Sequence, residues 1–296
     1  MKFVFNPAPP TTKLVRLTLL TGLLALGLSA CSLWRSAPAP APAQGPVRPP
    51  VATNPQVLLL GEVHDNAAGQ AARFAELQRR VLAGWRPAIA MEQFDADNQD
   101  LLTTAQRDCP DPDCIVRVME GPRWNWALYK NVMDLALTYD LPLLAANLSR
   151  ADASRVVRDG YGTTFDAATI AAYGLAAVPA DITAAQRREL VASHCNMLPD
   201  MMVDGMVKAQ IARDVVMARV LRAQRGRGVV LLAGNGHVRK DIGVPRWLAL
   251  GGPALSVSSF GYVEKGEAAG PGQFDKTTVV AVQARPDPCG APVAPN

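Results

Sequence analysis

The clearest indication of the fold is the stretch QVLLLGEVHDN, residues 56–66. Its apolar run is short and ends at Gly61, which is typical of a buried strand followed by a turn. The next segment, 67–82, carries apolar residues at helical spacing. The stretch therefore predicts a strand, a polar loop and a helix in direct succession.

The same alternation of strands and helices continues along the chain. Strands that alternate with helices pair in parallel through crossover connections. We therefore expect an α/β fold with a mainly parallel central sheet of about six strands, flanked by helices that include one at 125–139. Five further apolar runs predict the other strands: 88–91, 141–146, 228–233, 255–259 and 277–283.

Residues 149–224 show helical periodicity and no strand pattern. Four helices are expected there, and they predict a helical insert or small helical subdomain at about 150–225. The whole α/β domain is expected to span 55–290. The predicted helices of the insert are 151–157, 166–173, 183–194 and 199–224.

The first thirty residues are typical of a secretory signal peptide. Basic residues precede an uncharged apolar run at 17–28, and this run is shorter than the roughly 20 apolar residues that span a bilayer. The sequence LSAC at 28–31 matches a lipobox. We therefore expect a signal peptide over 1–30, cleaved before Cys31. The thiol of Cys31 is expected to carry diacylglycerol already at cleavage, and its acyl chains, such as palmitate, anchor the protein in a lipid bilayer.

Residues 31–54 predict a tether between this anchor and the folded domain, because they are rich in Pro and Ala. Ser32 lacks the acidic character that marks retention at the inner membrane in enteric bacteria, so we expect a cell-envelope protein at the outer membrane. The net charge of +4 is spread along the chain. This distribution indicates no nucleic-acid partner.

Four cysteines remain besides Cys31, and thiols oxidise in the envelope. Cys109 and Cys114 bracket a four-residue loop that is short enough to close, so we predict a disulfide between them. For Cys195 and Cys289 two interpretations stay open. They form a second disulfide that ties the C-terminal tail to the body, or they are a buried thiol and a free one.

Five of the predicted strands end in polar residues, and in an open parallel sheet ligands bind at that carboxyl edge. The sequence therefore predicts a site at the edge. The polar clusters are 61–65, 92–95, 147–150, 234–237 and 258–260.

The residue types at this edge are those of metal binding or proton transfer. Glu62 and His64 are two apart in extended chain, so their side chains leave the same face. Together with Glu92 and His237 they can meet one ligand. In a simpler interpretation, Glu62 and Asp65 only cap the following helix and His64 is a core residue.

The loop at 234–239 is expected to complete this polar pocket. Gly234 and Gly236 permit close backbone approach or positive φ, which is expected to leave His237 exposed at a sharp turn. The pocket is also expected to contain Asp65, Asn235 and Arg239.

The helix at 199–224 carries Arg213 and Asp214 on one face with Gln210 and Met217. We interpret Arg213 and Asp214 as a partly buried hydrogen-bonded pair that braces the sheet edge.

Six segments, taken in order, resemble the ChaN-like family of haem-binding lipoproteins. The lipobox before them fits that family too. The segments are GEVHDN (61–66), AMEQFD (90–95), WNWALYKNVMDLA (124–136), HCNMLP (194–199), AQIARDVVMA (209–218) and GNGHVRKDIGVP (234–245).

This resemblance implies a lipoprotein of haem and iron acquisition, with haem as its ligand and a haem-uptake receptor as its partner. It also implies a homodimer whose two subunits enclose haem, with a tyrosinate ligand from one and a histidine contact from the other. The candidate haem-binding residues in this chain are Tyr129, Tyr161, His194 and His237.

The GExH and GxGH motifs also resemble a wider superfamily that includes erythromycin esterases and the TraB and Tiki metalloproteases. That resemblance implies a rival function, in which the four Glu and His residues serve metal-dependent or Glu/His-dependent hydrolysis. Because this chain has all four of these Glu and His residues, they do not decide between haem binding and hydrolysis. The low aromatic content of 6% weakens the haem hypothesis, because porphyrin pockets usually offer stacking surfaces.

Overall fold

The computed structural model describes residues 53–119, 124–267, 269–286 and 289–290. The chain divides into two units, Met1–Val51 and Ala52–Asn296, and the described residues all belong to the second. The expected signal peptide, the lipidated Cys31 and most of the expected tether lie outside the described residues.

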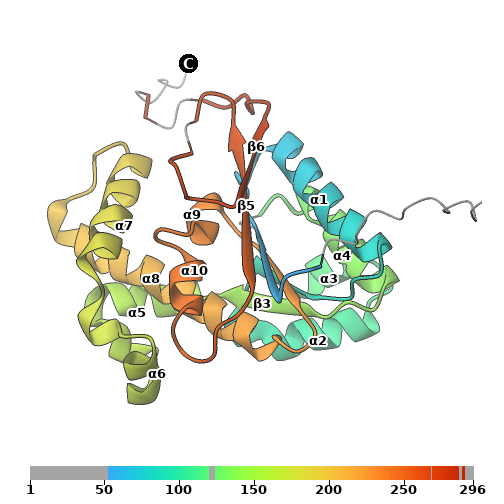
Figure 1. The fold of residues 1–296 in the computed structure, drawn as a ribbon, viewed down its shortest axis with the longest axis horizontal. Helices are drawn as coiled ribbons and strands as arrows, with labels where there is room; N and C mark the ends of the chain where they lie inside the picture. Colours follow the sequence, from blue (N-terminus) through green and yellow to red (C-terminus); the bar gives the residue numbers. More distant parts are fainter. Residues whose placement is uncertain (1–52, 120–123, 268, 287–288, 291–296) are drawn as a thin grey trace, which may run out of the picture. The chain divides into compact units, whose positions relative to one another are not determined.

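The second unit contains a six-stranded sheet in the order β3-β2-β4-β1-β5-β6, in which every neighbouring pair is parallel (Figure 1). The predicted α/β class and parallel sheet are confirmed. The strands are β1 Val57–Leu60, β2 Ala88–Asp95, β3 Leu143–Asn147, β4 Val229–Leu232, β5 Val257–Glu264 and β6 Lys276–Val280.

Helices cover both faces of the sheet, with α1–α4 on one side and α5–α8 on the other (Figure 1). The α-helices are α1 Ala67–Leu82, α2 Gln99–Asp108, α3 Pro112–Met119, α4 Lys130–Thr138, α5 Arg150–Asp159, α6 Ala167–Ala172, α7 Ala180–Ser193, α8 Asp200–Ala223, α9 Asn235–Val238 and α10 Val244–Leu248. Short 3-10 turns precede or separate some of them, at Ala96–Asn98, Trp126–Leu128, Tyr161–Thr163 and Leu175–Ala177.

Alternate residues of the central strand β1 point to opposite faces, as the twofold period of a strand requires. Leu58 and Leu60 pack with α1–α4, whereas Val57 and Leu59 pack with α5–α8 and α10. Because both faces are covered, the strand is apolar throughout rather than alternating. This explains why its sequence is a continuous apolar run.

The helices α5–α8 occupy the region of the expected insert, and they join the same apolar core as one face of the sheet. The sequence interpretation did not include α2 and α3. Both helices are short, at 10 and 8 residues, and α2 buries only Leu102 and Ala105, so few apolar residues mark the helical period there. The helix expected at 125–139 begins later, at Lys130, after a 3-10 turn at Trp126–Leu128.

Both disulfides are present. Cys109 and Cys114 are bonded, as predicted, and so are Cys195 and Cys289, which settles the alternative that the sequence left open.

Candidate functional site

Polar side chains from three neighbouring strands meet at the carboxyl edge of the sheet. Leu60 in β1 and Met91 in β2 both lie opposite Leu232 in β4. The residues that follow these positions therefore lie side by side, as the parallel register requires. The structure brings together the four predicted residues, Glu62, His64, Glu92 and His237.

Glu62 is the centre of a buried network. Its Oε1 accepts hydrogen bonds from the Tyr129 hydroxyl at 2.6 Å and from the Gln93 amide at 3.2 Å. Its Oε2 pairs with the Arg73 guanidinium, and the side chains of Glu62 and Arg73 are almost fully buried. A buried carboxylate is stable only when paired and hydrogen-bonded in this way.

Helix α1 is capped by a different residue from those expected. The side chain of Asn66 accepts a hydrogen bond from the backbone N–H of Gly69, which is the usual geometry of an N-cap. The alternative in which Glu62 and Asp65 serve only as caps is therefore wrong.

Tyr129 lies in the interior beneath Glu62. Besides donating to Glu62, its hydroxyl accepts a hydrogen bond from Gln70 at 3.3 Å, and the residue has no exposed surface. Burial raises the pKa of Tyr129 to about 12. In this arrangement the hydroxyl supports Glu62 and does not face the exterior.

His64 is oriented by Glu62. Its Nδ1 lies 2.7 Å from Glu62 Oε1, and because an ionised carboxylate only accepts, the imidazole donates from Nδ1. The opposite edge of the ring faces Gly234, where a Cβ would lie 3.2 Å from Nε2. The side chain of His64 remains 46% exposed. Nδ1 is thus engaged by Glu62, and Nε2 lies on the edge of the ring away from that carboxylate.

Gly234 accordingly permits close approach, as expected, but not through positive φ, because its φ is −52°. Its N–H donates to Glu92 Oε2 at 2.7 Å. The glycine therefore serves both neighbouring functional side chains, since His64 packs on it and Glu92 accepts from it.

His237 lies in the short helix α9 and not in an exposed turn, so that expectation is wrong. Its side chain is only 14% exposed. Nδ1 lies 2.6 Å from Oδ1 of the fully buried Asp214, and Nε2 lies 3.6 Å from Glu92 Oε1. The imidazole is therefore held between two carboxylates.

These carboxylates change the protonation of the imidazole. Burial by itself would lower the pKa of His237, but the charges of Glu92 and Asp214 outweigh it and raise the pKa. Burial raises the pKa of Asp214 to about 6. Burial by itself would raise the pKa of Glu92. The imidazoles of His237 and His64 and the N–H of Gly234 outweigh burial and hold this pKa below its usual value. Buried, mutually perturbed groups of this kind are typical of functional sites.

A cavity of about 430 Å³ opens beside these residues. Its walls are the loop at 62–64, Gly234 with the start of α9, and the second half of α7, with Gln210, Ile242 and Glu267 completing it. Asn235 lines it, as expected, and also hydrogen-bonds the backbone of Tyr262. The volume falls in the range of small-molecule pockets.

The other predicted residues lie around this site rather than in it. Asp65 pairs with Arg285, and Arg239 pairs with Asp241 and with Glu189 of the cavity wall. His194 is exposed at the end of α7, where its Nδ1 lies 2.8 Å from the Leu190 carbonyl.

Tyr161 is half-buried on the helical side and packs against the core formed with α5–α8. Burial raises the pKa of its hydroxyl. It does not line the cavity beside His64.

Arg213 and Asp214 both brace the sheet edge, as interpreted, but they do so through different partners. Arg213 donates to the side chain of Asn147 and the carbonyl of Leu148, whereas Asp214 holds His237. The sequence interpretation paired Asp214 with Arg213, whereas in the structure Asp214 contacts the site residue His237. The signal for Asp214 in the sequence was a carboxylate among the mostly apolar residues of α8 that are buried.

Within the described residues, no group of three or more His, Cys, Asp or Glu side chains is arranged to hold a metal ion. In the same part of the chain, no helix has the length and apolar character needed to cross a membrane.

A family model described as "Haem-binding uptake, Tiki superfamily, ChaN" matches residues 51–248. Among solved structures, the chain is similar to ChaN of Campylobacter jejuni with cofacially bound haem. The two share 21% identity with a TM-score of 0.61, over 73% of this chain and 84% of that one. This likeness shows a shared fold.

The chain is also similar to a mutant of the erythromycin esterase EreC in its open conformation, at 15% identity and a TM-score of 0.41 over 74% of each chain. A comparison with curated proteins gave no match.

Proposed function

Since the chain belongs to the ChaN family of haem-binding uptake proteins in the Tiki superfamily, we propose that it binds haem at the cavity beside His64. The observation that carries the proposal is the Glu62–His64 pair. Glu62 accepts from Nδ1, which leaves Nε2 as the nitrogen that is able to contact iron.

The chemistry of the surrounding residues supports this assignment. Imidazole is a common ligand of haem iron, and its partner carboxylate fixes the ring and raises its basicity. Val63, Leu190 and Ile242 offer apolar surface to a macrocycle along the cavity wall. His64 is also the most exposed of the four clustered residues.

The two candidate tyrosines are less suited to this contact in the arrangement seen. The hydroxyl of Tyr129 already donates to Glu62 in the interior. Burial raises the pKa of both Tyr129 and Tyr161, which disfavours the phenolate that binds Fe(III). We therefore propose His64 as the haem contact supplied by this edge of the sheet.

A hemin titration followed by absorption spectroscopy tests the proposal. We expect a Soret shift that saturates at one hemin per chain, and loss of that shift in His64→Ala. His194→Ala is the matched control, because His194 is also an exposed histidine but lies outside the cavity lining. Equal titrations of wild type and His64→Ala would overturn the assignment.

We also propose that the protein works as a lipid-anchored haem-uptake protein of the outer membrane, through acylated Cys31. The LSAC lipobox at 28–31 and the Pro/Ala-rich segment behind it support this. Cys31→Ser is expected to abolish fatty acylation and membrane fractionation. Membrane association of an acylated Cys31→Ser protein would contradict it.

By analogy with the family, we also propose that two chains form a homodimer that encloses haem. The haem is then exchanged with an uptake receptor. Sedimentation of the purified chain with and without hemin tests the dimer. We expect hemin to increase the dimeric fraction, whereas a monomer at saturating hemin would exclude an enclosed ligand.

Hydrolysis is a second candidate, favoured by the position of His237 between Asp214 and Glu92. An imidazole held by a carboxylate is the usual arrangement of a general base. Turnover of p-nitrophenyl acetate that is lost in His237→Gln, with hemin binding intact, would support this candidate. Absence of turnover in the wild type would count against it.

A further inference from the structure

The C-terminal segment after β6 is tied to three elements that surround the cavity. It runs over residues 281–290, of which 281–286 and 289–290 are described, and it follows residue 248, where the match to the family ends. Arg285 and Cys289 of this segment therefore lie outside the matched region, whereas their partners Asp65 and Cys195 lie inside it.

The first attachment is Arg285. Its guanidinium pairs with Asp65 at 2.8 Å and with Glu264 at 2.7 Å. Asp65 follows His64 directly, and Glu264 ends β5, three residues before the cavity residue Glu267. Arg285 therefore bridges two stretches of chain that lead to the cavity residues His64 and Glu267.

Backbone and amide contacts reinforce this attachment. Asn66 donates to the carbonyl of Ala281 at 2.8 Å, and the N–H of Gln283 donates to Glu264 at 3.0 Å. The start of the segment is thus held to the loop that positions His64.

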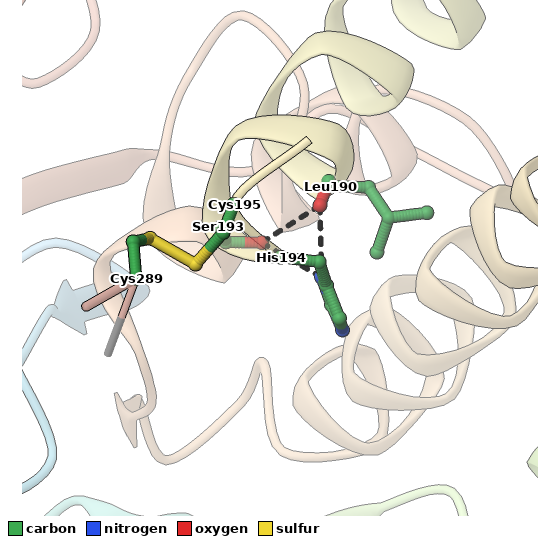
Figure 2. The surroundings of a disulfide bond; sticks show 5 residues. All are labelled: Leu190, Ser193, His194, Cys195 and Cys289. Carbon is green, nitrogen blue, oxygen red and sulfur yellow. Dashed lines mark hydrogen bonds between the residues drawn. A yellow bond between two sulfur atoms is a disulfide. The ribbon is translucent and has the colours of Figure 1, made fainter. Parts of the chain in front are cut away.

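The second attachment is the disulfide between Cys289 and Cys195, which joins residues 94 apart in the chain (Figure 2). Cys195 comes directly after Ser193 and His194 at the end of α7, as Figure 2 shows. Leu190 and Ser193 line the cavity on that side. The disulfide therefore ties the segment to the α7 wall of the cavity.

We propose that Arg285 and the Cys195–Cys289 disulfide together act as a clasp that holds the α7 wall against the His64 wall, so that the redox state of that disulfide controls ligand release. This inference rests on the proposed function for the identity of the ligand. Reduction by a dithiol supplies two electrons and two protons, breaks the S–S bond and gives two thiols, while the dithiol becomes a disulfide.

Helix α7 does not depend on the clasp for its place in the fold. Ile182, Gln186 and Leu190 are buried, and Arg246 and Arg239 pair with Asp181 and Glu189 of α7. Opening the disulfide is therefore expected to loosen the end of α7 without unfolding the domain.

The test compares the double variant Cys195→Ser/Cys289→Ser with the wild type in the purified chain. Hemin is loaded and its transfer to apomyoglobin is followed by stopped-flow absorption. We expect about tenfold faster release, because changes at a binding site act mainly on the dissociation rate. The matched control is Cys109→Ser/Cys114→Ser, since that disulfide packs with α1–α4 on the opposite face of the sheet. The control is expected to release hemin at the wild-type rate.

Hydrogen exchange without any ligand separates this inference from the proposed function. Amides of residues 186–196 are expected to exchange faster in Cys195→Ser/Cys289→Ser and not in the control. If hemin fails to bind but this difference appears, the proposed function is wrong and the clasp stands. Unchanged exchange, or unchanged hemin release from a protein that binds it, overturns the clasp.

Discussion

The carboxylate of Asp214 on α8 lies 2.6 Å from Nδ1 of His237 on α9, although 23 residues separate them. Asp214 is fully buried and His237 nearly so. The pair joins the helical side of the domain to the carboxyl edge of the sheet, so His237 has a structural role as well as a place in the site.

We therefore expect His237→Ala to destabilise the protein by about 1–3 kcal/mol, because Asp214 is left without its main partner in the interior. His64→Ala removes a half-exposed ring from a carboxylate that keeps three other partners, and is expected to cost about 1 kcal/mol or less. Urea unfolding of both variants measures the difference. Equal free energies of unfolding would show that Asp214 does not need His237.

Asp214→Asn removes the negative charge that faces the Nδ1 side of His237. The pKa of His237 is expected to fall, because only Glu92 then offsets the effect of burial. An NMR titration of the His237 ring protons measures the shift. A pKa unchanged from the wild type would mean that Asp214 is neutral in the folded protein over the range titrated.

Tyr129→Phe is expected to lower the free energy of unfolding by about 1–3 kcal/mol, because Glu62 loses a buried hydrogen-bond donor. The visible spectrum of the hemin complex is expected to stay the same. Loss of a phenolate-to-iron charge-transfer band in this variant would instead identify Tyr129 as an iron ligand, and the buried arrangement would then have to change on binding.

Gly234→Ala places a methyl group 3.1 Å from Cε1 of His64, so the exposed ring must move away. We expect weaker hemin binding with a folded domain. Gly226→Ala is the matched control, because a Cβ there meets nothing within 4 Å and Gly226 lies outside the cavity lining. Hemin titration and circular dichroism of both variants check the prediction, and equal affinities would argue against a contact at His64.

Acid is expected to weaken the attachment of the C-terminal segment. The hydrogen bond from Arg285 is the main cause that holds the pKa of Glu264 at about 2, against an ordinary value of 4.5. A lowered pKa stabilises the fold above the unfolded-state pKa, so this contribution is present above pH 4.5 and is lost as the pH falls toward 2.

Arg285→Gln removes the ion pair with Glu264, so the variant is expected to lose less stability in acid than the wild type. Its melting temperature should therefore vary less than that of the wild type between pH 4.5 and pH 2. Thermal melts across that range measure it. Parallel curves for the two proteins would contradict the role of Arg285.

Local sequence patterns predict much of this architecture. The run at Val57–Leu60 predicts a strand, because a strand buried on both faces is apolar throughout. The spacing after it predicts a helix, because a helix buried on one face repeats apolar residues at the helical period. The polar residues at the ends of the strands then predict an edge site, because parallel strands align their carboxyl ends. Glu62, His64, Glu92 and His237 were found in this way.

Only the tertiary structure decided the partners of those residues. Tyr129 meets Glu62 across 67 residues and Asp214 meets His237 across 23, and no local period records such contacts. The burial of His237 likewise depends on how α8 packs against the sheet, since Asp214 of α8 contacts it. Local sequence determines which chemical groups reach the edge, whereas packing of distant segments sets their environment and hence their protonation.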